Sequence, residues 1–237
     1  MTKKLVALIT GGSKGIGYGI AEAMVKEGHD VIITSRNLAG IKEAGNKLSA
    51  LGKGGVLALQ ADVRNFNDMK DTVQQSLNHW KKIDVVVANA GIGHFAPIDD
   101  LTVEQWQETM DINLTGVFYT LKASLDALKA SKGYFITISS LAGTNFFAGG
   151  SAYNASKFGL TGFSQAVMLD LRKYGIKVTT IMPGSVATYF NNHQPNPSDA
   201  WKIQIEDLGQ IVVDLLRLPA RTLPSKIEVR PTQPPGS

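Results

Sequence analysis

Two side chains four residues apart, Tyr153 and Lys157, have the chemistry for proton transfer. The residues around them follow a helical pattern, and residues i and i+4 lie on one face of a helix, so we expect the two side chains to be neighbours. A nearby ammonium group favours the phenolate and lowers the pKa of a tyrosine from about 10, which makes the phenol a usable acid or base near neutral pH. The spacing alone is common, and taken by itself it indicates a surface pair.

Three further motifs, each at the end of a predicted strand, indicate that this pair belongs to a site. Ser139 ends the strand that precedes the Tyr153 helix, and Asn89-Ala90-Gly91 and Pro183-Gly184 close two other strands. In open parallel sheets, ligands bind at the carboxyl edge. We therefore expect Ser139, Tyr153 and Lys157 to meet at that edge.

A glycine-rich turn, Thr10-Gly-Gly-Ser-Lys-Gly-Ile-Gly17, connects the first predicted strand to the first predicted helix. Such a turn places backbone N–H groups and a helix N-terminus against a phosphate, and glycine permits positive φ and close approach of a pyrophosphate. The spacing is G-x-x-x-G-x-G, and the Gly-Lys-Ser/Thr of a P-loop is absent. In this strand–turn–helix context the turn predicts dinucleotide binding. The residues expected to contact the dinucleotide here are Gly11, Ser13, Lys14, Gly15, Ile16 and Gly17.

The end of the second predicted strand reads Ser35-Arg36-Asn37 and carries no acidic residue. An acidic residue about 20 positions after the glycines would bind the 2′-hydroxyl of NAD and would repel a 2′-phosphate. A serine hydroxyl and an arginine guanidinium suit a 2′-phosphate, and Lys14 adds a second positive charge. These residues therefore predict NADP(H); the alternative is that Arg36 and Lys14 are exposed cations without a ligand.

Short apolar strands alternate with amphipathic helices along the whole chain. The alternation predicts an α/β fold of the Rossmann-like, doubly wound type, with a mostly seven-stranded parallel sheet and helices on both faces. No repeat or interdomain linker interrupts the pattern, so residues 1–237 are predicted to form a single domain. The predicted strands are 4–10, 30–35, 54–61, 83–88, 133–139, 177–182 and 227–230; the predicted helices are 15–27, 38–51, 67–80, 102–128, 152–174 and 206–216; an exposed loop is expected at 191–199 and a proline-rich tail at 231–237.

The composition excludes several classes of function. The 237 residues include no cysteine, which removes disulfides, thiolate zinc sites, iron–sulfur clusters and cysteine nucleophiles. The four histidines are far apart, and no metal site is predicted. Lys and Arg number 24 against 20 Asp and Glu, but they are scattered, which argues against nucleic acid binding. The apolar run at 5–9 is too short to span a membrane, so we expect a soluble, cytoplasmic protein.

Taken in order along the chain, these motifs resemble those of the short-chain dehydrogenases/reductases of the compact, single-domain type. The resemblance extends from about residue 4 to residue 188, and 206–216 is similar to a later helix of the family. The matching segments are the glycine turn, Asn89-Ala-Gly91, Asn113, Ser139, Tyr153-x-x-x-Lys157 and Pro183-Gly-x-x-x-Thr188.

The resemblance implies four catalytic residues. Tyr153 would exchange a proton with the substrate carbonyl oxygen, and Ser139 would hydrogen-bond that oxygen, so that two donors stabilise its developing negative charge. Lys157 would lower the pKa of Tyr153 and hold the nicotinamide ribose, and Asn113 would hold a water that connects Lys157 to solvent. Further cofactor contacts are implied for Asp62, Val63, Asn89, Ala90, Gly91, Pro183, Gly184, Val186 and Thr188.

The segment after Thr188 is short, and 189–200 is predicted to be a short substrate loop. The family usually has a longer cover there, so we expect an open site that accepts a bulky carbonyl. Nearby aromatic residues favour an apolar or ring-bearing substrate, unless some of them only pack the loops. The carboxylates Glu104, Glu108 and Asp111 are expected to form a solvated helix face. The pocket candidates are His94, Phe95, Ser139, Asn145, Phe146, Phe147, Tyr189 and Phe190.

Together these features favour an NADPH-dependent reductase that converts a ketone or aldehyde to an alcohol, reversibly, with the proton supplied by Tyr153. One alternative is reduction of a 3-oxoacyl thioester on an acyl carrier protein, a common activity in the family; the short loop and the lack of a basic docking patch weigh against it. A second alternative is a non-catalytic NADP-binding sensor or scaffold, which would be expected to lack Ser139, Tyr153 or Lys157. The family also pairs its long helices, which implies a homodimer or homotetramer acting on a small molecule.

Overall fold

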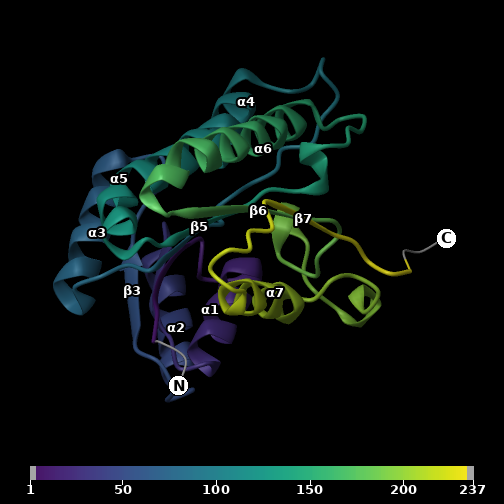
Figure 1. The fold of residues 1–237 in the computed structure, drawn as a ribbon. Helices are drawn as coiled ribbons and strands as arrows, with labels where there is room; N and C mark the ends of the chain where they lie inside the picture. The colour runs from purple at the N-terminus through teal and green to yellow at the C-terminus, as the bar shows by residue number, and fades with distance from the viewer. Residues whose placement is uncertain (1–3, 234–237) are drawn as a thin grey trace.

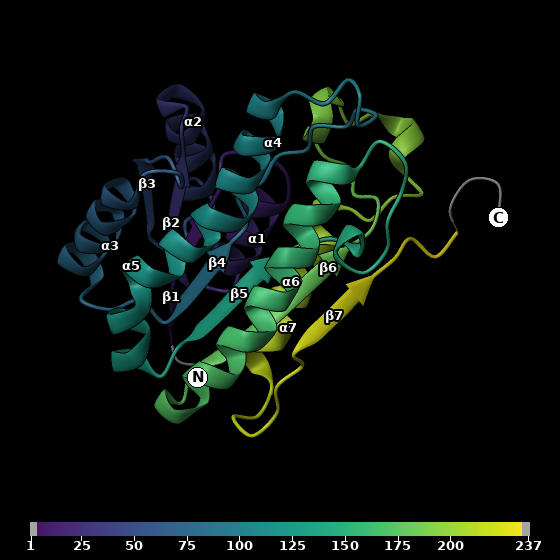
Figure 2. The same ribbon diagram turned by 90° about the horizontal axis from the view of Figure 1, so that it is seen from above.

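The computed structural model describes residues 4–233 and contains a seven-stranded parallel sheet with helices on both faces (Figures 1 and 2). The strand order is β3-β2-β1-β4-β5-β6-β7. The predicted fold class is confirmed, and the last part of the predicted tail, 234–237, lies outside the described residues. The strands are β1 Val6–Thr10, β2 Asp30–Ser35, β3 Val56–Gln60, β4 Val85–Ala88, β5 Tyr134–Ile138, β6 Lys177–Pro183 and β7 Lys226–Val229.

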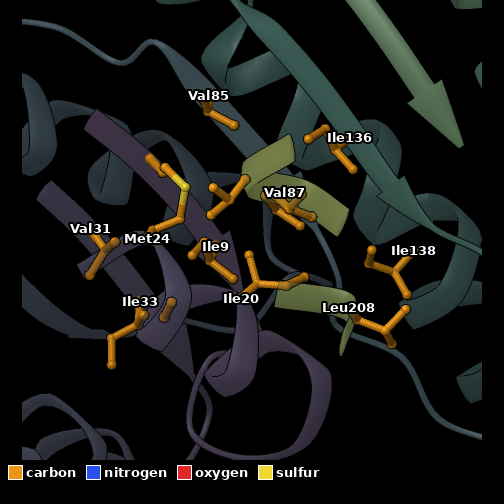
Figure 3. Packing of buried hydrophobic residues seen from close by; sticks show 14 of the residues in the cluster. Ile9, Ile20, Met24, Val31, Ile33, Val85, Val87, Ile136, Ile138 and Leu208 are labelled. Atoms are coloured by element: carbon orange, nitrogen blue, oxygen red, sulfur yellow. The ribbon is translucent and has the colours of Figure 1, made fainter. Parts of the chain in front are cut away.

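Both faces of the sheet are apolar and covered by helices. In β1, Ala7 and Ile9 pack into a core cluster with α1, α2 and α7, whereas Val6 and Leu8 pack into a second cluster with α3, α5 and α6. Figure 3 shows Ile9 beside Ile20 of α1 in the first cluster. Because both faces of the central strands are buried, β1, β4 and β5 appear in the sequence as mostly apolar runs, whereas the edge strands β3 and β7 are partly exposed. The α-helices are α1 Gly15–Lys26, α2 Leu38–Ser49, α3 Phe66–Trp80, α4 Val103–Met110, α5 Gly116–Ser131, α6 Ser151–Leu171 and α7 Ile205–Arg217.

The chain from 102 to 128 differs from the single helix that the sequence predicts. A π-helical turn, Asp111–Thr115, separates α4 from α5. This turn carries Asn113, whose side-chain amide donates to the Ile92 carbonyl at 2.8 Å and whose oxygen accepts from the Ile92 N–H at 2.9 Å. The widened turn directs a buried polar side chain to the backbone beside β4, in agreement with the frequent occurrence of π-helical turns at functional sites. The other predicted elements differ from the structure mainly at their ends.

The carboxyl ends of the strands lie along one edge of the sheet, and the sequence motifs follow them directly. The direction of winding reverses between β1 and β4, because β2 and β3 lie on one side of β1 and β5, β6 and β7 lie beyond β4. Ligands bind at such a switch point in open α/β sheets. The glycine turn after β1 and Asn89 after β4 therefore flank the expected ligand position. Within residues 4–233, no helix has the length and apolar character needed to cross a membrane.

Candidate active site

A cavity of about 870 Å³ lies at the switch point between β1 and β4. Its walls come from the glycine turn, the ends of β2 and β5, the loop after β4, the start of α6 and the segment after β6. Most of the predicted cofactor and catalytic residues are brought together here. Those that line the cavity are Gly11, Ser13, Lys14, Gly15, Ile16, Ser35, Arg36, Asp62, Val63, Asn89, Ala90, Gly91, Ser139, Tyr153, Lys157, Pro183, Gly184, Val186 and Thr188.

The glycine turn is shaped by two residues with positive φ, Gly11 at +68° and Gly15 at +61°. A Cβ on Gly11 would lie 2.9 Å from the Cα of Ala90, so the two loops approach too closely for a side chain. Gly17 does not line the cavity, in contrast to its prediction as a contact residue. A Cβ there would lie 2.5 Å from the amide nitrogen of Asn89, so Gly17 instead allows α1 to pack against the loop after β4.

The end of β2 presents polar and charged groups at one end of the cavity. Ser35 and Arg36 line it, but Asn37 does not. The Asn37 side chain caps α2 by accepting a hydrogen bond from the Gly40 N–H at 2.8 Å, which is a structural role. Sequence reasoning missed Thr34, which also lines the cavity and whose buried hydroxyl oxygen has no hydrogen-bond partner within residues 4–233. Such an atom is available to a bound ligand.

Lys157 is anchored deep in the cavity wall. Its side chain is only 4% exposed, and its Nζ donates to the Ile138 carbonyl at 3.0 Å. Asn113 does not line the cavity but lies behind it, since a Cβ on Gly91 would be 3.3 Å from the Asn113 oxygen and 3.6 Å from the Lys157 Nζ. The amide of Asn113 also donates to the Ser156 hydroxyl at 3.0 Å. The position beside Lys157 is compatible with the predicted relay role of Asn113, which stays a prediction.

The two serines that follow β5 face different surroundings. The Ser139 hydroxyl is buried against α6, where it donates to the Lys157 carbonyl at 3.3 Å and shares a 3.1 Å hydrogen bond with Thr161. Ser140 lines the cavity, and its hydroxyl is hydrogen-bonded to the Tyr153 phenol. The serine hydrogen-bonded to Tyr153 is therefore Ser140 and not the predicted Ser139, and the role of Ser139 at the substrate oxygen stays a prediction.

The alternation of side chains along an extended strand could have revealed this difference. Thr137, two residues before Ser139, also points to α6, where its hydroxyl lies 3.0 Å from that of Ser164. Successive residues of a strand point to opposite faces. Ser139 therefore continues the face of Thr137, and Ser140 continues the other.

The surroundings of Tyr153 also change its electrostatics. Burial raises the pKa of Tyr153, and the hydrogen bond with Ser140 offsets part of that rise. Lys157 Nζ lies 5.7 Å from the centre of the Tyr153 ring and bonds the Ile138 carbonyl. Desolvation of the phenolate is therefore the largest influence on the pKa of Tyr153, and the lowering effect expected of Lys157 stays a prediction. Burial also lowers the pKa of Lys157 to about 8, so its ammonium remains mostly protonated at neutral pH.

Two aromatic rings contact the ring of Tyr153, and a third contacts one of these. Its ring centre lies 5.3 Å from that of Phe95 and 5.6 Å from that of Phe190, and the Phe95 ring lies 5.8 Å from that of Phe147. We call these three phenylalanines the aromatic collar. Of the predicted pocket residues, Ser139, His94, Tyr189 and Phe190 line the cavity, whereas Phe95 and Phe147 contact it only through other rings.

Two predicted pocket residues lie away from the cavity. Asn145 contributes its backbone carbonyl, which accepts a hydrogen bond from the Asn154 side chain at 2.8 Å, and therefore shapes the loop after β5. Phe146 is 86% exposed. Neither residue lines the cavity, so their assignment as pocket residues is corrected.

The segment after β6 reaches over the site although it is short. Phe190 packs on Tyr153, and the segment is pinned by the buried carboxylate of Asp199, which lies 2.6 Å from both the His193 and the Lys202 side-chain nitrogens. The site is therefore less open than the short segment predicted, because the loop packs over Tyr153. Sequence reasoning missed His193, Trp201 and Lys202 as cavity residues.

A charged group at the other end of the cavity was also missed. Glu108, assigned from the sequence to a solvated helix face, lines the cavity. Its carboxylate lies 3.0 Å from the His94 Nε2 and 3.6 Å from a guanidinium nitrogen of Arg36. Glu104, one turn earlier on α4, is exposed as expected.

The residues present fit a dinucleotide. The glycine turn leaves room for a phosphate at the N-terminus of α1, and Lys14 and Arg36 supply positive charge at two points of the cavity wall. Thr34 offers a hydroxyl without a partner in the described chain. Across residues 4–233, no group of three or more His, Asp or Glu side chains is arranged to hold a metal ion.

Comparison with known proteins agrees with this geometry. A family model described as short chain dehydrogenase matches residues 5–198. An uncharacterized oxidoreductase of Staphylococcus aureus strain MW2 is 31% identical over 227 residues, which cover 95% of this chain and 96% of that protein. The crystal structure of an alcohol dehydrogenase from the archaeon Thermococcus sibiricus, complexed with 5-hydroxy-NADP, is 27% identical and superposes with a TM-score of 0.92 over 99% of this chain and 100% of that one.

A 3-ketoacyl-ACP reductase from Sinorhizobium meliloti 1021 is also similar, with 31% identity and a TM-score of 0.86 over 95% of this chain and 97% of that one. The match of the family model covers most of the chain, and the relatives match over nearly their full length. The chain belongs to the short-chain dehydrogenase/reductase family of oxidoreductases.

Proposed function

We propose that the protein reduces a ketone or aldehyde to an alcohol with NADPH, and catalyses the reverse reaction with NADP. The observation that carries this proposal is that Ser140, Tyr153 and Lys157 lie in the same cavity as the glycine turn and Arg36. Arg36 supports NADPH because a guanidinium suits a 2′-phosphate. The similar Thermococcus sibiricus alcohol dehydrogenase, complexed with 5-hydroxy-NADP, supports the same cofactor.

In this proposal, side chains of the protein donate the proton and stabilise the charges that develop. The nicotinamide, when bound, supplies the hydride. Tyr153 donates its phenolic proton to the substrate oxygen, and Ser140 donates a second hydrogen bond to that oxygen, so two donors stabilise the charge that develops there. The ammonium of Lys157, whose pKa is about 8, lies near enough to stabilise the phenolate that remains.

The surroundings of Tyr153 support an apolar, ring-bearing carbonyl as the substrate. Phe95 and Phe190 contact the Tyr153 ring directly, and ring edges and faces are favourable partners for another ring. The 3-oxoacyl thioester remains the second candidate, supported by the similarity to the Sinorhizobium meliloti reductase. The two differ in shape, because a thioester on a carrier protein must approach through an extended chain.

The test is the decrease of reduced-nicotinamide absorbance with NADPH and with NADH, against aromatic aldehydes, aryl ketones, diketones and 3-oxoacyl thioesters. We expect NADPH oxidation with the aromatic carbonyls. The variant Tyr153→Phe should lose roughly 10²–10⁴-fold in turnover while binding NADPH normally, since the ring stays and the proton is gone. The matched control Tyr174→Phe makes the same change outside the cavity and should be unaffected.

Other outcomes identify the alternatives. Activity confined to the thioesters would show that the substrate is a 3-oxoacyl thioester and not an aromatic carbonyl. Tight NADPH binding with no turnover on any substrate would favour a non-catalytic NADP-binding sensor or scaffold. Failure of the wild type to bind either nucleotide would contradict the proposed cofactor.

We also propose that the chain self-associates as a homodimer or homotetramer, as the family resemblance implies. The long helices α5 and α6 support this, because Phe118, Phe158 and Leu169 on them are exposed large apolar residues. Light scattering on the purified chain tests the oligomeric state, and a monomer at micromolar concentration would refute it.

A further inference from the structure

Glu108 lines the cavity and lies close to both Arg36 and His94. One of its oxygens lies 3.6 Å from the Nη1 of Arg36 and 3.6 Å from the Nη1 of Arg64. Its other oxygen lies 3.0 Å from the Nε2 of His94, in the loop after β4. Three side chains from three different segments thus face one carboxylate on α4.

This carboxylate is an anion next to the proposed phosphate site. The hydrogen bond with His94 and the positive charges of Arg36 and Arg64 hold the pKa of Glu108 below its ordinary range, so the group is ionised at neutral pH. Arg64 already has its own anionic partner, because its guanidinium hydrogen-bonds both oxygens of Asp62. Arg36 has no carboxylate partner other than Glu108 among the ion pairs of residues 4–233.

We propose that Glu108 is a cofactor-specificity residue whose carboxylate opposes the 2′-phosphate of NADPH at Arg36, and so reduces the preference for NADPH over NADH that Arg36 alone would produce. The inference rests on the proposed function, since it concerns the same cofactor site. Its position was not expected, because the acidic residue that favours NAD in dinucleotide-binding folds follows the second strand, and here that position is held by Ser35-Arg36-Asn37.

The direction of the effect follows from the charges. An anion that reaches Arg36 also lies within a few ångströms of Glu108, because the two side chains are 3.6 Å apart. A phosphate dianion is repelled there, and it must share the guanidinium with the carboxylate. The 2′-hydroxyl of NADH carries no charge, and a hydroxyl can donate a hydrogen bond to a carboxylate. Glu108 therefore acts against one nucleotide and not against the other.

The test measures the dissociation constants of NADPH, NADH and 2′,5′-ADP by isothermal titration calorimetry at pH 7.5, for the wild type and Glu108→Gln. The glutamine keeps the shape and a hydrogen bond to His94 while it removes the charge. We expect NADPH and 2′,5′-ADP to bind roughly tenfold more tightly, the effect of removing one charge about 6 Å from a dianion in a water-like dielectric. NADH should change less than twofold. The difference should shrink in high salt, since the groups are partly exposed.

The matched control is Glu104→Gln, which removes the same charge from an exposed position of α4 that does not line the cavity. It should leave all three constants within twofold. Glu108→Ala serves as a second variant, and thermal melting confirms that each variant is folded. The inference is overturned if Glu108→Gln leaves NADPH affinity unchanged, weakens it, or tightens NADH equally. If the wild type binds neither NADPH nor 2′,5′-ADP, the proposed cofactor itself fails, which is a separate result.

Discussion

The floor and the rim of the cavity are built in different ways. On the floor, Lys157 is almost fully buried and donates to the Ile138 carbonyl of β5, and Asn113, buried behind it, bonds the Ile92 backbone after β4. On the rim, the aromatic collar is held by ring contacts, and Phe147 and Phe190 remain partly exposed. Backbone bonds to a buried sheet fix a position more firmly than contacts between exposed rings.

From this difference we expect the floor to control the reaction and the rim to control the choice of substrate. The floor positions the groups that would act on any carbonyl, because a sheet edge and its bonds stay in place whatever the substrate. We expect the rim to determine which molecule reaches Tyr153, because its side chains lie on loops. Changes on the floor should therefore remove turnover for every substrate, and changes on the rim should affect some substrates more than others.

The two neighbouring serines test the floor most strongly. Ser140→Ala removes a donor beside Tyr153, and we expect turnover to fall roughly 10²–10³-fold, the usual loss of one donor to a developing oxyanion. Ser139→Ala is the matched control, because its hydroxyl bonds Thr161 and the Lys157 carbonyl. That variant should lose less than tenfold. Steady-state kinetics with the best substrate compares them, and a larger loss for Ser139→Ala would return the role to Ser139.

The buried Lys157 on the floor makes the free energy of unfolding depend on pH. Its pKa is about 8 in the folded protein against an ordinary value of 10.5, so between about pH 8 and 10.5 the unfolded chain binds more protons. The contribution of Lys157 to the free energy of unfolding therefore rises with pH over that range, and below it the buried charge destabilises the fold. Lys157→Met should lack this rise and should lose about 100-fold in turnover.

The same variant should be more stable at pH 7, by about 2 kcal/mol. The pKa difference corresponds to about 3 kcal/mol, and the lost hydrogen bond to the Ile138 carbonyl subtracts about 1 kcal/mol. Urea unfolding of the wild type and the variant at pH 7 and pH 10 measures both quantities. Lys122→Met, a change at an exposed residue of α5, is the control and should show neither effect. A destabilised Lys157→Met at pH 7 would contradict the account of the buried charge.

Arg36 tests the end of the cavity away from the rim, where the wall is polar and half-exposed. Arg36→Ala should weaken NADPH binding by roughly 10–100-fold, because a charge-assisted hydrogen bond is worth about 1.5–3 kcal/mol, and should weaken NADH less than threefold. Titration calorimetry with both nucleotides measures the difference. Arg221→Ala, at an exposed position outside the cavity, is the control. Equal losses for the two nucleotides would show that Arg36 does not bind the 2′-phosphate.

The fold and most of the floor could be predicted from the sequence because local signals agree with the global arrangement. The apolar strands report burial on both faces of the sheet, and the glycine turn reports a close approach of two loops that only glycine allows at Gly11. The i, i+4 spacing correctly indicated that Tyr153 and Lys157 share one helix face. These signals depend on neighbours in the chain, which the sequence contains.

The errors arose where the decisive contact comes from another part of the chain. Glu108 reads as solvated from its own helix, and only the fold brings Arg36 and His94 to it. The pKa of Tyr153 depends on its burial, and Phe190, which packs on its ring, comes from a segment far along the sequence. The choice between Ser139 and Ser140 depends on which face of β5 meets α6.

Phe190 offers the smallest and most selective change, and it sharpens the contrast between rim and floor. Phe190→Ala removes a ring that contacts Tyr153, so KM for an aryl ketone should rise about fivefold, in line with the ~0.5–1.5 kcal/mol of an aromatic pair, while KM for a small aliphatic ketone stays within twofold. Removing the cover also exposes the Tyr153 phenol, whose pKa is raised by burial. The rise of kcat/KM with pH for alcohol oxidation, which needs the phenolate, should therefore move to lower pH. Phe146→Ala deletes the same ring at a position 86% exposed and should change neither quantity, and equal effects from the two variants would show that the rim does not select the substrate.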